Sequence, residues 1–142
     1  MEINEAKVAK LAGDMTQALH TLEGYARMGE EEFLSNPERV GNAKYTLIVA
    51  MEAAIDLCRH IVARLGMRTP SDYADCFAVL GEAGVVSEEL ADRLAQMARF
   101  RNLLVHLYGR VDDRRVFRII QDDIRDLKDY IGCIFRYMGR TA

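Results

Sequence analysis

Residues 90–109 constrain the fold most strongly, because they read as one helix whose surface is apolar nearly all the way round. At about 100° per residue, one set of side chains points within roughly 60° of a single direction. The set comprises Leu90, Leu94, Met97, Arg101, Leu104, Val105 and Tyr108. A second apolar group is centred about 110° away and comprises Phe100, Leu103 and Leu107. Such a helix is usually buried on more than one side, and we expect the same here.

The rest of the chain also shows helical spacing of apolar residues, with neither strand alternation nor an internal repeat. This spacing runs from Ile3 to Tyr25, from Leu47 to Leu65, from Tyr73 to Leu80 and from Val116 to Met138. The pattern predicts an all-α fold, an up-and-down bundle of about five helices with one short extra helix. A chain of 142 residues fits a single domain, and we expect residues 1–142 to form one.

Capping residues and glycines mark the expected ends of these helices. Asn36 suits an N-cap, with Pro37 at the first helical position. Ser87 precedes two glutamates and begins the helix described first. Gly66 and Gly109 are the expected stops of two helices, since glycine accepts the backbone conformation that ends a helix.

Apolar runs and cysteine usage indicate the class of protein. No segment approaches the roughly 18 uncharged apolar residues of a membrane span. The acidic start, Met1 to Glu5, lacks the basic-then-apolar order of a secretory signal. Cys58, Cys76 and Cys133 are odd in number and lie within helical patterns, which argues for a reducing compartment and against disulfides. We expect a soluble cytoplasmic protein without membrane contact.

Basic charge is concentrated around the end of the helix described first. The net charge of −3 argues against a general nucleic-acid coat. The segment from Arg93 to Arg118, however, carries seven arginines against two aspartates, a net +5 that leaves −8 for the rest. Arginine suits bidentate contact with phosphate. Arg99, Arg110 and Arg114 are therefore candidate phosphate contacts, although two ordinary solvated helix ends would carry the same charges.

Arg101 stands in the middle of an apolar stripe and therefore needs a partner or a chemical role. Burying an unpaired guanidinium costs roughly several kcal/mol, and a carboxylate from another helix would satisfy it. Asp56 is the candidate to hold Arg101 or His106, because it stands with Glu52 and His60 at intervals of four residues on one side of a helix. A solvated, salt-bridged helix face has the same pattern.

The run from Arg101 to Tyr108, R-N-L-L-V-H-L-Y, resembles the R-N-x4-H-x-Y signature of HEPN-fold proteins, specifically the HepT toxin family paired with MntA nucleotidyltransferase antitoxins. Residues 53–61 and 69–73 are similar to the family's second helix and the turn after it, so the resemblance covers essentially the whole chain. It implies an endoribonuclease that needs no metal and has a composite site at a homodimer interface. It also implies a partner that AMPylates Tyr108.

Cleaving RNA without a metal requires a base for the ribose 2′-hydroxyl proton, an acid for the leaving oxygen and a cation for the developing charge. His106 and Arg101 can supply proton transfer and charge, and Asn102 is placed to orient the imidazole or the substrate. A twofold dimer supplies two copies of each group. Five residues on a regular helix direct Arg101 and His106 about 140° apart. They converge if the helix loosens near His106, or if each arginine works with the other protomer's histidine.

Two further expectations concern the surface. Phe100, Leu103 and Leu107 form apolar surface that one core cannot easily use, so we expect a homodimer through this helix. Tyr108 is expected beside Arg101, where an attached AMP would block RNA by charge and bulk. The alternative is a tyrosine that packs its ring and hydrogen-bonds its hydroxyl.

Other chemistry finds no support in the sequence. His20, His60 and His106 are dispersed and no cysteine pair has ligand spacing. Phosphate loops, nucleophile elbows and dinucleotide fingerprints are absent, so we expect neither a metal nor a cofactor. Two alternatives stay open: a non-catalytic substrate- or nucleotide-binding subunit of a nucleotidyltransferase complex, and a dimeric scaffold whose signature residues only hold the interface.

Overall fold

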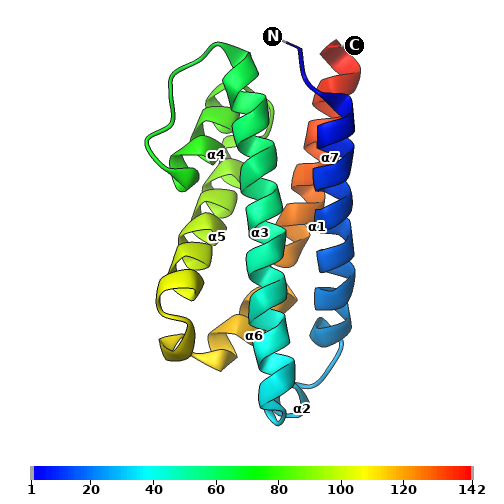
Figure 1. The fold of residues 1–142 in the computed structure, drawn as a ribbon, viewed down its shortest axis with the longest axis vertical. Helices are drawn as coiled ribbons and strands as arrows, with labels where there is room; N and C mark the ends of the chain where they lie inside the picture. Colours follow the sequence, from blue (N-terminus) through cyan, green and yellow to red (C-terminus); the bar gives the residue numbers. More distant parts are fainter. Residues whose placement is uncertain (1, 142) are drawn as a thin grey trace.

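The computed structural model describes residues 2–141 as α-helices, one short 3-10 helix and connecting turns. In chain order the elements are α1 (Glu5–Ala26), α2 (Glu30–Leu34), α3 (Pro37–Leu65), α4 (Tyr73–Glu82), α5 (Glu88–His106), η1 (Tyr108–Arg110), α6 (Asp113–Asp122) and α7 (Ile124–Thr141). Figure 1 shows α3 in the middle of the bundle, with α1 and α7 on one side and α4 and α5 on the other. The prediction of an all-α bundle is confirmed. Within the described range, no helix has both the length and the apolar character needed to cross a bilayer.

Side-chain caps begin α3 and α5 where the sequence predicts them. Asn36 Oδ1 accepts hydrogen bonds from two backbone N–H groups of the first turn, at 3.0 and 3.3 Å. Ser87 Oγ accepts one from the backbone N–H of Leu90 at 3.1 Å. Gly66 follows α3 with a φ of 70°, a left-handed conformation that favours glycine. The predicted start and end of α3 are therefore confirmed.

The helices of the structure differ from the expected ones in two places outside the signature. A short helix, α2, lies in the connection before α3, and the expected final helix is divided into α6 and α7 at Asp123. Consecutive aspartates at 122 and 123 favour a break, because their short carboxylates compete for backbone hydrogen bonds. Just after the break, Asp126 is buried and accepts a hydrogen bond from Arg93 at 3.0 Å, which ties the new helix to α5.

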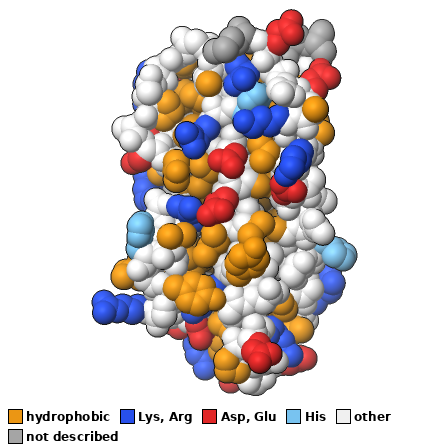
Figure 2. Space-filling model, viewed as in Figure 1, with side chains coloured by type: hydrophobic (Ala, Val, Ile, Leu, Met, Phe, Trp, Pro, Cys, Tyr) orange, Lys and Arg blue, Asp and Glu red, His pale blue; other side chains and the backbone are white. Residues whose placement is uncertain are grey.

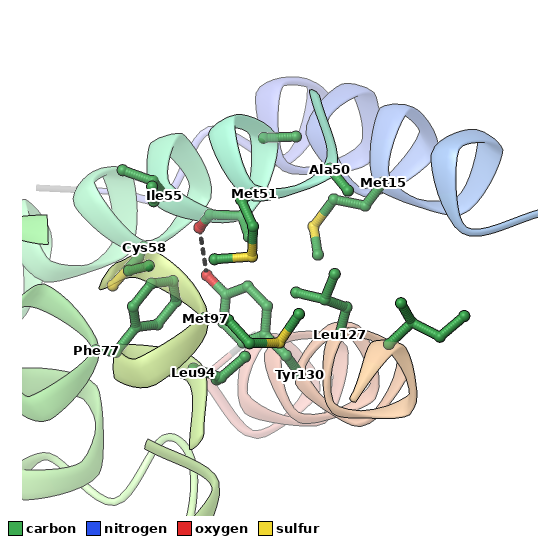
Figure 3. Close-up of a cluster of buried hydrophobic side chains, with 14 of the residues drawn as sticks. Met15, Ala50, Met51, Ile55, Cys58, Phe77, Leu94, Met97, Leu127 and Tyr130 are labelled. Carbon is green, nitrogen blue, oxygen red and sulfur yellow. Dashed lines mark hydrogen bonds between the residues drawn. The ribbon is translucent and has the colours of Figure 1, made fainter. Parts of the chain in front are cut away.

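The core is continuous, and Tyr130 on α7 lies at its centre. Figure 3 shows its ring among Met51 of α3, Met97 of α5 and Phe77 of α4. The Tyr130 hydroxyl donates to the backbone oxygen of Ala54 at 3.0 Å, and the ring meets Phe77 edge to face with centroids 5.6 Å apart. Complete burial raises the pKa of Tyr130 well above its ordinary value, so the hydroxyl stays a donor. This one side chain joins four helices.

Two free thiols also join α3 to α4. Cys58 Sγ lies 3.1 Å from Cys76 Sγ, and both residues are buried. Burial raises the pKa of Cys58, whereas the hydrogen bond from Cys58 lowers the pKa of Cys76. The contact fixes the start of α4 against α3, and with it Tyr73, which lies three residues before Cys76.

Candidate functional site

Arg101 reaches from α5 to α3 and is largely buried, with 16% of its side chain exposed. One terminal nitrogen donates to Glu52 Oε1 at 2.8 Å, and the other donates to Asn102 Oδ1 at 3.0 Å. Its Nε is buried and has no hydrogen-bond partner among the described residues. A buried donor without a partner costs free energy. The structure therefore holds a preorganised cation with one N–H still unused.

The carboxylate that holds Arg101 is Glu52, which corrects the expectation for Asp56. These acids stand one turn apart on α3, and the packing of α5 against α3 brings the earlier one to Arg101. Asp56 is exposed and forms no ion pair with any residue that the structure describes. The partner that Arg101 requires is thus a carboxylate from another helix, Glu52 of α3.

Tyr73 is a part of this site that the sequence analysis missed. It is the first residue of α4, and its ring centroid lies 5.7 Å from Cζ of Arg101 and 5.9 Å from Cζ of Arg59. These distances are close to the limit of a cation–π contact. The sequence carries no signal for this arrangement, since the three residues belong to different helices and meet only in the folded chain.

His106 is the last residue of α5 and is exposed. The helix ends there because Leu107 adopts φ −127° and ψ 36°, so the expected stop at Gly109 lies three residues too late. From Arg101 to His106 the helix is regular, and the two side chains point about 140° apart. Asn102 bonds to Arg101 rather than orienting His106. The structure does not bring Arg101 and His106 of one chain together.

Tyr108 lies against the beginning of α3. Its hydroxyl donates to the backbone oxygen of Gly41 at 3.0 Å, and a Cβ at position 41 would lie 3.4 Å from that hydroxyl. Lys44 Nζ lies 4.9 Å from the ring centroid, donates to the Tyr108 backbone oxygen at 3.2 Å and pairs with Asp113 at 2.9 Å. Lys44 is buried, and its position three residues before Leu47 on the apolar face of α3 could have identified it.

These contacts separate Tyr108 from Arg101. Gly41, which holds the tyrosine hydroxyl, and Glu52, which holds the guanidinium, stand about 16 Å apart along α3. The expectation that Tyr108 lies beside Arg101 is therefore wrong. The physical reason is the early end of α5, which lets the chain turn toward α3. The hydroxyl is hydrogen-bonded, as the alternative expected, but the residue remains partly exposed.

The three arginines expected to contact phosphate differ in their surroundings. Arg99 and Arg110 are exposed and form no ion pair within the described residues. Arg114 pairs with Glu30 at 3.2 Å and Glu31 at 3.0 Å, which ties α6 to α2. The hydrogen bond to Glu31 raises the pKa of Arg114. Of these three, Arg99 and Arg110 present a charge that no carboxylate among the described residues neutralises.

The exposed apolar surface of α5 differs from the expected one. Phe100 is buried, and Arg115 of α6 covers its ring at 4.8 Å from the centroid. The large exposed apolar side chains near the end of α5 are instead Val105, Leu107 and Tyr108, at 43%, 41% and 42%. Figure 2 shows hydrophobic side chains gathered on this face over the lower part of α3 and the adjoining end of α5. Val105 therefore takes the exposed position that was expected of Phe100.

A groove of about 920 Å³ opens between α1, α3 and the start of α4. Its charged lining comprises Lys7, Arg59, Arg64, Arg68, Asp56 and Asp72. His60 on its wall accepts a hydrogen bond at Nε2 from the backbone N–H of Asn4, 3.0 Å away. Burial and the charges of Arg64 and Lys7 lower the pKa of His60. Among the described residues, no three His, Cys, Asp or Glu side chains form a group that could hold a metal.

Lys44→Met should show how strongly α3 holds the Tyr108 segment. Methionine has a similar length, but the Tyr108 carbonyl and Asp113 lose their donor. We expect the free energy of unfolding to fall by about 1–3 kcal/mol in urea titrations. Lys128→Met is the matched control, because its pair with Glu23 is half exposed and should contribute less than about 1 kcal/mol. Equal losses in both variants would contradict the anchoring role.

Comparisons with known proteins identify relatives of this chain. The family model described as Ribonuclease HepT-like matches residues 15–134. A putative RNase of Archaeoglobus fulgidus is 35% identical over 91 residues, which cover 64% of this chain and 68% of the relative. The tRNA nuclease HepT of Aphanizomenon flos-aquae is 28% identical over 120 residues, 84% of this chain and 82% of the relative.

One solved structure extends the comparison to the fold. It holds a tri-AMPylated Shewanella oneidensis HEPN toxin in complex with MNT antitoxin. The toxin superposes with a TM-score of 0.85 at 21% identity, and the alignment covers 94% of this chain and 98% of that chain. The fold is therefore shared, and the resemblance identified from residues 101–108 is confirmed. Since the family match spans most of its length, this chain belongs to the HepT-like ribonuclease family.

Proposed function

We propose that this protein is a cytoplasmic HepT-type toxin, an endoribonuclease that needs no metal and is neutralised by a nucleotidyltransferase partner. The observation that carries the proposal is the state of Arg101, a largely buried guanidinium oriented by Glu52 and Asn102 with one N–H unused. Such a preorganised cation suits the charge that develops on a phosphate during cleavage. Membership of the HepT-like family and the nuclease names of its relatives support RNA as the substrate.

The chemistry follows from the groups that the signature supplies. The ribose 2′-hydroxyl attacks the adjacent phosphorus while the imidazole of His106 accepts its proton. Arg101 stabilises the negative charge of the phosphorane. The bond from phosphorus to the 5′-oxygen then breaks, and a second, protonated imidazole gives its proton to the leaving oxygen. His106 is exposed at the end of α5, where RNA can reach it.

The separation of Arg101 and His106 within one chain favours a composite site. Because a regular helix directs them about 140° apart, we assign Arg101 of one protomer and His106 of the other to the same phosphate. In a twofold homodimer the two His106 imidazoles can lie on opposite sides of that phosphate, one at the 2′-hydroxyl as the base and the other at the leaving 5′-oxygen as the acid. The exposed Val105 and Leu107 flank His106 and provide apolar contact for such a dimer.

The homodimer is tested by sedimentation at micromolar concentration. The parent chain should sediment as a dimer, and Val105→Asp should shift it to a monomer, because a buried unpaired carboxylate costs roughly several kcal/mol. Phe135→Asp is the matched control, since Phe135 is an exposed apolar residue of α7, at 47%, and should leave the dimer intact. A monomeric parent chain would rule out the composite site.

Cleavage is tested with labelled RNA in the presence and absence of EDTA. His106→Ala should lower the rate by about 10²–10⁴-fold, because proton transfer is lost. Arg101→Lys should lower it by about 10²–10³-fold, because lysine keeps the charge but loses the planar, oriented donors. EDTA should have no effect.

His20→Ala is the control for histidine substitution, since His20 is exposed on α1, outside the signature. It should cleave at the parent rate. Circular dichroism checks that each variant is folded. Full activity of the Arg101→Lys variant would remove Arg101 from the chemistry.

Exposed arginines near the signature are proposed to carry neighbouring phosphates. Arg99 and Arg110 have no carboxylate partner among the described residues, so each can bind a phosphate without breaking an ion pair. Arg114 joins them only where RNA displaces Glu30 and Glu31, so its contribution is expected to be smaller.

Tyr108 is proposed as the residue that an MntA-type nucleotidyltransferase modifies. Its hydroxyl oxygen would attack the α-phosphorus of ATP, an O–P bond would form, pyrophosphate would leave, and the phenolic proton would pass to a base. The hydroxyl must first release the Gly41 oxygen. The new phosphodiester would lie near Lys44 and Arg110, and the adenosine would cover the exposed end of α5.

Tyr108→Phe tests this assignment. The variant should fold and cleave RNA, because the lost hydrogen bond contributes only about 0.5–1.5 kcal/mol. After incubation with the partner and ATP it should gain no AMP mass and stay active, whereas the parent should gain AMP and lose activity. Tyr45→Phe is the control and should be modified and silenced like the parent, since Tyr45 is an exposed tyrosine, at 63%, outside the signature. A Tyr108→Phe chain that is still modified and silenced would place AMP elsewhere.

One observation favours the alternative of a non-catalytic, nucleotide-binding subunit. Glu52 already neutralises Arg101 in the free chain, as it would in a residue with only a structural role. That alternative predicts nucleotide binding without RNA cleavage, and the cleavage assay above distinguishes the two.

A further inference from the structure

The groove between α1, α3 and α4 is not used by the proposed cleavage, yet it adjoins the cleavage site through one side chain. Tyr73 lines the groove and also lies 5.7 Å from Cζ of Arg101. Arg59, which lines the groove, lies about 10 Å beyond Glu52 along the axis of α3. A single strand bound at Arg101 can therefore continue along α3 into the groove.

We propose that this groove is a subsite for a nucleotide of single-stranded RNA flanking the cleaved bond, with its base on Tyr73 and its phosphate on Arg59. The inference rests on the proposed function, since it extends the RNA path from Arg101. It goes beyond that function because it assigns substrate binding to residues outside the signature. It also favours single strands over duplexes, in which the bases are already stacked.

Tyr73 has the properties of a base-stacking residue. It is 37% exposed, although it is a large aromatic side chain. Its backbone is fixed because Cys76, one turn later, packs on Cys58, and Asp72 caps the helix by accepting from the backbone N–H of Asp75 at 2.7 Å. A fixed, exposed ring beside cations is the arrangement on which proteins stack unpaired bases.

Arg59 is free to move from the ring to a phosphate. It is exposed, and its contact with Tyr73 at 5.9 Å is close to the outer limit for a cation–π interaction. No carboxylate pairs with it among the described residues. A base that approaches Tyr73 would displace this guanidinium, and the phosphate that arrives with the base would offer it a stronger partner.

The rest of the lining adds cations that form no ion pair among the described residues. Lys7 has no ion pair within the described range, and Arg64 donates only to backbone oxygens, those of Glu2 and His60, both at 2.8 Å. Arg68, in contrast, pairs with two acids of α4 and contributes little. The opposing acids of the lining are Asp56 and Asp72. Three cations without an ion pair against these two acids leave the lining net positive, which favours an anionic ligand even in a chain with a net charge of −3.

The groove is held in shape before any ligand arrives. His60 and Arg64 bind the backbone of Asn4 and Glu2, which holds the start of the chain against α3. The turn before α4 is held by Arg68, which donates to Asp75 at 2.7 and 2.8 Å. A preformed site loses less free energy to ordering when it binds.

The test measures binding in a His106→Ala background, so that the RNA stays intact. The probe is a pool of fluorescein-labelled single-stranded RNAs, each about 12 nucleotides long. Binding is measured by fluorescence anisotropy. Tyr73→Leu should raise Kd at least about fivefold, while Tyr73→Phe should leave it within about twofold. Arg59→Gln should raise Kd and lower the slope of log Kd against log salt by about 0.7. Arg125→Gln is the control, since Arg125 is an exposed cation of α7, which contributes nothing to the groove.

The outcomes separate this inference from the proposed function. If a folded Tyr73→Leu variant binds the RNA pool as tightly as the His106→Ala chain without that substitution, the inference is overturned, whatever the cleavage assay shows. Stronger competition by an acidic peptide than by unlabelled RNA would overturn it as well. If His106→Ala still cleaves RNA but binding depends on Tyr73, the proposed chemistry fails and the subsite stands. No RNA binding by the parent would overturn both.

Discussion

The requirement that Arg101 find a carboxylate constrains how α5 lies against α3. A guanidinium in an apolar stripe cannot stay unpaired without a cost of roughly several kcal/mol, so α5 must present Arg101 to a carboxylate, and the 2.8 Å contact meets this need. The need is met only in part, because Nε stays without a partner and Glu52 is half exposed. A half-exposed pair is weak, so a phosphate can compete for Arg101 without unfolding the bundle. The same contact positions the helix and keeps the cation available.

Local signals predicted most of the helices, since capping and periodicity depend on residues close together in the chain. The caps at Asn36 and Ser87 needed only the first turn of each helix. The break at Asp123 escaped prediction because the apolar spacing continues across it, and the contact that ties the helix after the break to α5 is distant in sequence. Asp126 is drawn to Arg93 of α5, a contact 33 residues back along the chain.

The sequence predicted the residues of the site better than it predicted the residues that they contact. Helical phase placed Arg101 in the core face, and the structure agrees. Helical periodicity could not show whether Glu52 or Asp56 pairs with Arg101, because both lie on one face of α3. Only the packing of α5 against α3 decides which of them is in reach. Helical periodicity also gave the wrong direction for Tyr108, because α5 ends at His106 and the angle of 100° per residue no longer applies beyond it. Tyr73 could not be found at all, since it comes from a separate helix.

Because α3 contacts Tyr108, Arg101 and Tyr73, these three residues of the proposed mechanism are separated along one rigid helix. Gly41 holds Tyr108, Glu52 holds Arg101 and Arg59 lies beside Tyr73. From Gly41 to Arg59 the helix extends about 27 Å. An AMP group on Tyr108, as proposed, would therefore act at one end of this path and leave the Arg101–Glu52 pair undisturbed. Inhibition would then come from blocking the approach of RNA and of a second protomer at the exposed end of α5, rather than from distorting the cation that is proposed to stabilise the transition state.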